Sequence, residues 1–132
     1  MWFKIAAIMG ALAVILGAFG AHGLESYFKA DNLDPKALND VEKGLIEIWK
    51  TATKYHLVHA VVLLVLATLS VDVTWSMRLF FTGICIFSGT LYLMCLLYAF
   101  TGVKYGFLGA ITPIGGLCLI IGWISLIFVK WP

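Results

Sequence analysis

Residues 105–129 read YGFLGAITPIGGLCLIIGWISLIFV, which is 25 consecutive positions without an acidic or basic side chain. A helix rises about 1.5 Å per residue, so this stretch would measure about 38 Å as a helix, more than the roughly 30 Å hydrocarbon core of a bilayer. The stretch therefore predicts a helix that crosses a membrane.

Three further charge-free stretches precede it, at residues 5–24, 55–71 and 79–103. In lipid every backbone amide must be bonded within the protein, so only helices or a closed barrel can cross, and four segments are too few to close a barrel. The sequence therefore predicts four membrane helices, spanning approximately residues 5–24, 55–71, 79–101 and 106–129.

The composition of the whole chain agrees with a lipid environment. Of its 132 residues, 62% are hydrophobic and only 12% are charged, and the mean hydropathy is +1.01. Soluble domains are about half apolar and a quarter charged. These values exclude a secreted disulfide scaffold, a disordered tail and a soluble enzyme. The net charge of +2 is too small to indicate nucleic acid as a partner, which leaves membrane lipids.

Residues 35–54 form the only sizeable polar segment that has a helical pattern. Asp34 and Pro35 are typical of a helix start, and apolar residues then recur at helical spacing opposite a charged face. We expect an amphipathic helix that is continuous with the second span and lies on the membrane interface or packs over the mouth of the bundle, with Trp49 at headgroup level.

The remaining connections, at residues 72–76 and around Lys104, are short, so consecutive helices should be antiparallel neighbours. The predicted fold is an all-α, integral membrane four-helix up-down bundle with an amphipathic interfacial helix between the first two membrane helices. It forms one domain over residues 1–132.

The basic residues predict an orientation. We call the end that holds the first and third connections the loop side, and the end that holds both termini the terminal side. The loop side carries six basic residues, namely Lys29, Lys36, Lys43, Lys50, Lys54 and Lys104. The terminal side carries three, namely Lys4, Arg78 and Lys130. The positive-inside rule then places the loop side in the cytoplasm, most simply of a bacterial plasma (inner) membrane.

Small residues at a spacing of four mark the expected packing faces. They are Ala13, Gly17 and Ala21 in the first helix, and Gly102, Gly106 and Ala110 leading into the fourth. Such spacing lets helix backbones approach closely. We expect packing within one bundle, with a homo-oligomer as the second expectation.

Three histidines are the main candidates for chemistry. His22 ends the first span, and His56 and His59 lie on one face at the start of the second, which an antiparallel pair would bring to the same depth. Structural hydrogen bonding is the favoured interpretation. The alternative is a metal site for zinc or copper, or a haem site, built from His22, His56 and His59.

Hydroxyl groups in the last two helices suggest a polar core or a small ligand groove. The third helix contains Ser88, Thr90 and Tyr92, and the fourth contains Thr112 beside Pro113. Pro113 should kink its helix and free the carbonyl of Gly109, which Ser88 or Tyr92 could bond. Tyr55, His22 and His59 would complete this set from the first two helices.

Features of an enzyme are missing from the sequence. The predicted spans contain no acidic or basic side chain, and the three cysteines, Cys85, Cys95 and Cys118, are spaced neither as a zinc site nor as a redox pair. No P-loop, G-x-S-x-G or H-E-x-x-H motif occurs. We therefore expect a non-enzymatic protein.

Four motifs together resemble the YgdD/YwdK-like family of small membrane proteins, whose function is uncharacterised and which has a mitochondrial relative in animals. They are residues 17–24 (GAFGAHGL), the set Trp49, Ala52, Tyr55 and His59, residues 87–92 (FSGTLY), and residues 111–116 followed by Gly122 and Trp123. The resemblance covers nearly the whole chain and implies four membrane helices without an established activity. The family often has Gln where this chain has His56, and its polar segment before Trp49 is shorter.

These observations lead to three hypotheses. The favoured one is a non-enzymatic membrane protein whose polar residues hold the helices in register, around a lipid or another small apolar ligand. The second is the metal- or haem-binding protein described above. The third is an oligomeric pore lined by Thr82, Ser88 and Thr112.

Overall fold

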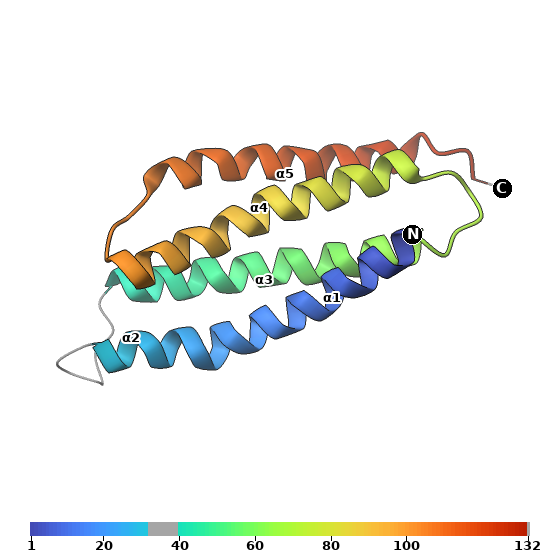
Figure 1. Cartoon of the computed structure of the whole chain (residues 1–132). Helices are drawn as coiled ribbons and strands as arrows, with labels where there is room; N and C mark the ends of the chain where they lie inside the picture. Colours follow the sequence, from blue (N-terminus) through green and yellow to red (C-terminus); the bar gives the residue numbers. More distant parts are fainter. Residues whose placement is uncertain (32–39, 132) are drawn as a thin grey trace.

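The computed structural model describes residues 1–31 and 40–131, and every regular element in these ranges is helical. The elements are α1 (Trp2–Ala18), the π-helix η1 (Phe19–Leu24), α2 (Glu25–Asp31), α3 (Asp40–Leu66), α4 (Thr74–Thr101) and α5 (Gly106–Ile127). Because α1, η1 and α2 follow one another without a break, the described chain forms four long helical rods (Figure 1). The prediction of an all-helical chain is confirmed.

Three of the rods are long and apolar enough to cross a membrane, namely Trp2–Phe28, Thr74–Thr101 and Gly106–Ile127. The fourth rod, α3, differs from them because its first half carries Asp40, Lys43, Glu47, Lys50 and Lys54. The structure thus confirms three apolar, membrane-length helices.

The helix that contains the second predicted span is shorter at its C-terminal end than the charge-free stretch. The helix ends at Leu66 rather than at residue 71, and α4 begins at Thr74, inside the predicted connection. The cause is local bonding: the hydroxyl of Thr68 donates to the carbonyl of Val65 at 2.7 Å, and the carboxylate of Asp72 accepts the backbone N–H of Thr74 at 3.0 Å. Such side-chain bonds compete with helix continuation and favour helix ends.

Residues 40–54 of the predicted interfacial helix form the first half of α3 and run unbroken into its second half. The predicted start at Asp34 and Pro35, with residues 35–39, lies outside the described residues. Trp49 was expected to face the lipid headgroups as an interfacial anchor. Its side chain is buried in the protein instead, with only 1% of its surface exposed. Its indole packs inside the protein, where it finds a hydrogen-bond acceptor.

Neighbouring rods in the chain are neighbours in space. α3 packs on α1 and on α4, and α4 packs on α5, so α3 and α4 form a central pair with α1 and α5 on either side (Figure 1). The start of α1 and the end of α5 lie at the same end of the molecule in this view. This order places the contacts between η1, α3 and α4 in the middle of the protein.

Close approach of α4 and α5 depends on glycines other than the predicted ones. A side chain at Gly115 would collide with the backbone of Phe87, and one at Gly122 would meet the ring of Phe80. Gly106 has open space around it, and Gly102 ends α4 with a positive φ of 68°. Ala13, in contrast, is fully buried, as a packing position should be.

Candidate functional site

Trp49 forms the centre of a contact between η1, α3 and α4. Its Nε1–H donates to the carbonyl of Leu16 at 2.8 Å, and its ring lies 4.7 Å from the ring of Tyr92 between centroids. A Cβ at Gly20 would overlap the indole, so this position requires glycine. We call the recess formed by Gly17 and Gly20 the glycine notch. The side chain of Trp49 therefore packs into the glycine notch and holds the first rod against α3.

Hydroxyl groups join α3 to α4 one turn further along. The Oγ of Ser88 donates to the carbonyl of Ala52 at 2.9 Å, and both residues are buried. The hydroxyl of Tyr92 lies 3.4 Å from the Oγ1 of Thr53 and 3.4 Å from the Nδ1 of His56. Since each bond crosses between two helices, these groups fix the relative register of α3 and α4.

The imidazole of His59 is bonded at both nitrogens. Its Nδ1 lies 2.8 Å from the carbonyl of Tyr55, and its Nε2 lies 3.2 Å from the Nε1 of Trp123. A carbonyl only accepts and an indole N–H only donates, so the proton of the neutral ring is on Nδ1 and the lone pair on Nε2 is occupied. Both nitrogens are thereby engaged within the protein.

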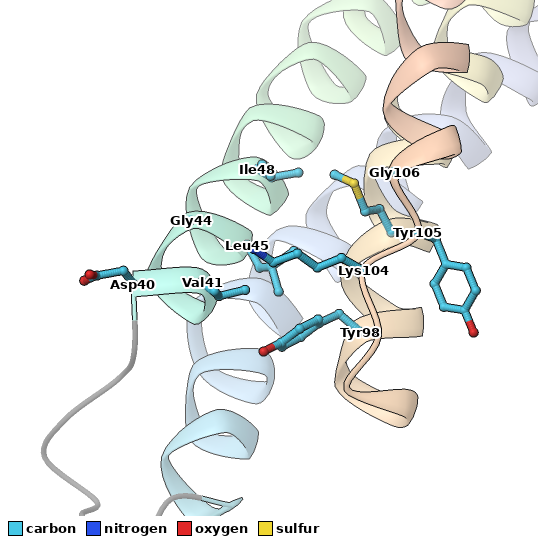
Figure 2. A pocket seen from close by; sticks show the side chains of 10 residues that line it. Asp40, Val41, Gly44, Leu45, Ile48, Tyr98, Lys104, Tyr105 and Gly106 are labelled. Carbon is cyan, nitrogen blue, oxygen red and sulfur yellow. The ribbon is translucent and has the colours of Figure 1, made fainter.

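A pocket of about 460 Å³ opens on the loop side, between the start of α3, the end of α4 and the connection to α5 (Figure 2). Its lining is mostly apolar and consists of Asp40, Val41, Gly44, Leu45, Ile48, Met94, Tyr98, Lys104, Tyr105 and Gly106. Figure 2 shows the side chain of Lys104 reaching across the pocket toward α3, whereas Asp40 and Tyr105 point away from it. The volume is in the range of small-molecule sites.

Comparison with known proteins places these contacts within a family. A family model described as "Protein of unknown function (DUF423)" matches residues 16–116, which include Leu16, Trp49, Phe87 and Gly115. The chain belongs to the DUF423 family.

The relatives of this DUF423 protein are named membrane proteins. A UPF0382 membrane protein of Staphylococcus epidermidis is 44% identical, covering 94% of this chain and 93% of its own. YwdK of Bacillus subtilis, also named a UPF0382 membrane protein, is 37% identical and covers 94% of both chains. A UPF0382 membrane protein of Schizosaccharomyces pombe is 36% identical over 95% of this chain and 97% of its own. No solved structure matches.

These matches confirm the resemblance to the YwdK-like family and make the chain a membrane protein of unknown function. The names of these three relatives describe membrane proteins and mention no enzymatic activity.

The structure of this DUF423 protein does not bring the three histidines together as a ligand set. His22 is exposed on η1, whereas His56 and His59 are 4% and 5% exposed inside the helix contacts. Within residues 1–31 and 40–131, no group of three or more His, Cys, Asp or Glu side chains could hold a metal ion. The described part of the chain thus gives no support to a zinc, copper or haem site.

The remaining predicted residues take different places. The hydroxyls of Thr90 and Thr112 lie 2.9 Å apart across α4 and α5. Tyr55 is 43% exposed and stacks on His59, and Pro113 lies on the exposed side of α5, which continues as a helix through it. Ser88 and Tyr92 of α4 bond Ala52 and Thr53 of α3 rather than the carbonyl of Gly109.

Several residues that shape this site were missed by sequence reasoning. Of the glycine notch, the sequence predicts only Gly17 as part of a packing face, and it predicts no partner for Trp49, Trp123 or Lys104. The signal that was available is the pairing of Gly17 and Gly20 with a large aromatic residue in the next helix.

Proposed function

We propose that this protein is a non-enzymatic, multi-pass membrane protein that holds a single-chain lipid in the loop-side pocket. The occupant would be a long-chain fatty acid, with its acyl chain along the apolar lining and its carboxylate at the ammonium of Lys104. The observation that carries the proposal is a pocket of about 460 Å³ whose wall is mostly apolar and in which, among the described residues, Lys104 is the one charged side chain that reaches inward (Figure 2).

Charge favours an anionic headgroup over a cationic one. Asp40, the acidic residue of the pocket, points outward and lies 3.6 Å from the ammonium of Lys43. The cation of Lys104 is then the group that a ligand in the pocket meets. An aliphatic stem that covers apolar surface while its charge reaches a polar group is usual for lysine in such positions.

The proposal includes the predicted topology. All four rods would cross the bilayer as an up-down bundle, with the first half of α3 at the interface and the loop side in the cytoplasm of the plasma membrane. The unequal number of lysines and arginines at the two ends supports this orientation. The bonds of Ser88, His59 and Thr90 to neighbouring helices would keep the rods in register, with His22, Tyr55 and Pro113 at the edge of this polar core.

Filling the pocket provides the test. Gly44 lines the pocket and has open space around it, so Gly44→Phe would occupy the pocket without a clash in the backbone. We expect it to abolish binding of a spin-labelled stearate to the purified protein, and Lys104→Gln to weaken binding about fivefold, as for the loss of about 1 kcal/mol.

Gly109→Phe is the matched control, because Gly109 is exposed on α5, has open space around it and does not line the pocket. Binding that is the same in Gly44→Phe and Gly109→Phe would refute the pocket as the site.

The pore hypothesis gains no support from the described residues. Ser88 and Thr112 are buried and bonded to Ala52 and Thr90, so their hydroxyls are engaged between helices. A homo-oligomer stays a prediction, and native mass spectrometry of the detergent-purified protein would measure it.

A further inference from the structure

The outward face of α3 changes character halfway along the helix. Its first half exposes charged side chains, namely Lys43, Glu47, Lys50 and Lys54. Its second half exposes apolar ones, namely Leu57, Val58, Val61 and Val65. The apolar part, residues 55–66, measures about 18 Å as a helix, which is much shorter than a hydrocarbon core of about 30 Å.

Contacts between helices show how deep the charged half lies. Ser88 bonds to the carbonyl of Ala52, and the backbone of the adjacent Phe87 touches Gly115 of α5. Ala52 is therefore level with Gly115, which is about 13 Å along α5 from its first residue. The backbone of Lys54, two residues beyond Ala52, lies close to the middle of α5, whose full length is about 33 Å.

At this level the flanking helices present apolar side chains. Ile114 and Leu117 of α5 are 55% and 56% exposed, and Val14 and Ile15 of α1 are also exposed. A lysine facing acyl chains at such depth is costly unless a polar partner reaches it. The lysines on the outward face of α3 thus need polar partners at a level where the neighbouring helices expose apolar side chains.

A hollow of about 270 Å³ lies beside these lysines. The hollow lies between the first rod and α3. Its lining consists of Gly17, Gly20 and Ala21 on the first rod, and of Trp49, Lys50, Thr53 and Lys54 on α3. Glycine at position 17 keeps space open beside Thr53, because a Cβ at Gly17 would lie 3.1 Å from the methyl group of Thr53. The hollow is separate from the loop-side pocket, with which it shares no lining residue.

The two lysines of the hollow differ in their partners. The ammonium of Lys50 lies 2.6 Å from a carboxylate oxygen of Glu47, and Glu25 adds a weaker electrostatic attraction. In the described part of the chain, no hydrogen bond or ion pair joins the ammonium of Lys54 to another residue. Lys54 is therefore the cation that is left to meet an anion in the hollow.

We propose that the hollow is a binding site for the phosphate of an anionic membrane phospholipid, with Lys54 as its cationic ligand and the first rod at Gly17 and Ala21 as its facing wall. Helical side chains lean toward the N-terminus of their helix, and the N-terminus of α3 is on the loop side. The ammonium of Lys54 is thereby directed toward the loop-side headgroups. A phospholipid bound here would have its phosphate drawn below the ordinary headgroup plane, next to α3.

This inference goes beyond the fatty-acid pocket and does not depend on it, because the two sites use different lysines. The test is native mass spectrometry of the full chain in mild detergent with equal amounts of phosphatidylglycerol and phosphatidylcholine. We expect the protein to retain phosphatidylglycerol preferentially. Lys54→Gln should reduce this retention about fivefold, whereas Lys54→Arg should preserve it.

Two further variants separate the site from general surface charge. Lys43→Gln removes an exposed lysine of the same face that is paired with Asp40 and lies outside the hollow, so retention should not change. Ala21→Leu fills the hollow from an exposed position without altering any charge, so retention should fall.

Equal loss in Lys43→Gln and Lys54→Gln would overturn the proposal, as would full retention in both Lys54→Gln and Ala21→Leu. Displacement of the lipid by millimolar glycerol 3-phosphate would identify a soluble phosphate as the ligand instead. Conversion of a dimer to a monomer by Lys54→Gln, without a change in bound lipid, would assign this face to a second copy of the chain.

Discussion

At the scale of single residues, the contact between Trp49 and Gly20 determines how closely the first rod approaches α3. The indole is 1% exposed, and its N–H reaches the carbonyl of Leu16. The sequence placed Trp49 near a predicted interface and could not show that its ring points inward. That direction depends on which face of α3 meets the glycine notch, and this is a property of two segments rather than of one.

Gly20→Ala should destabilise the protein. The added Cβ overlaps the Trp49 ring, and overpacking of this kind typically costs about 1–3 kcal/mol. Gly10→Ala is the matched control, because nothing lies within 4 Å of a Cβ at that position. Alanine there should be neutral or slightly stabilising, since glycine disfavours helix interiors by about 0.5–1 kcal/mol.

The measurement is the midpoint of thermal unfolding in one detergent for both variants and the unchanged protein. Equal midpoints for Gly20→Ala and Gly10→Ala would show that the notch does not hold Trp49.

At the scale of elements, charge-free stretches predicted the existence of the helices well and their ends less well. Residues 106–127 agree with the prediction for the last span almost to the residue, because Lys104 and Lys130 bracket it. Residues 67–71 are equally free of charge but are not helical, because Thr68 and Asp72 bond the backbone locally. The loop-side pocket could not be predicted either, since it joins residues of α3 to residues more than forty positions later.

The start of α4 should respond to pH through Asp72. The backbone N–H and the hydroxyl of Thr74 lower the pKa of Asp72, with a smaller effect of Arg78. A lowered pKa in the folded state means that the stabilisation is present above the unfolded pKa of about 4 and is lost as the pH falls through the folded value.

We therefore expect the unchanged protein to be more stable than Asp72→Asn at pH 6, and the difference to shrink as the pH is lowered below about 4. Thermal unfolding of both proteins at a series of pH values measures this difference. Because other carboxyl groups are common to the two proteins, a difference that does not vary with pH would contradict the role of Asp72.

At the scale of the whole molecule, the central question is whether α3 crosses the bilayer with the other rods. Its position between α1 and α4 supports a crossing, whereas its charged first half shortens the apolar part. The sequence predicted the crossing from residues 55–71. The proposed phosphate site explains how the charged half could be accommodated beside apolar neighbours.

Cysteine accessibility tests this crossing. In a background without Cys85, Cys95 and Cys118, we expect Lys43→Cys and Asp72→Cys to be labelled from opposite sides of the membrane by an impermeant maleimide. Both positions are exposed, and they lie before and after the apolar part of α3. Labelling of both from the same side would mean that α3 does not cross.

The order of packing also bears on how the protein is made. Each rod after the first packs on the rod that precedes it in the chain, α3 on the first rod, α4 on α3, and α5 on α4. During synthesis, domains and segments nearer the N-terminus emerge first, and contacts between sequence neighbours form faster than distant ones. Each new helix therefore finds the preceding rod, on which it packs, already synthesised. The glycine notch can close on Trp49, and Ser88 can reach Ala52, before α5 has left the ribosome.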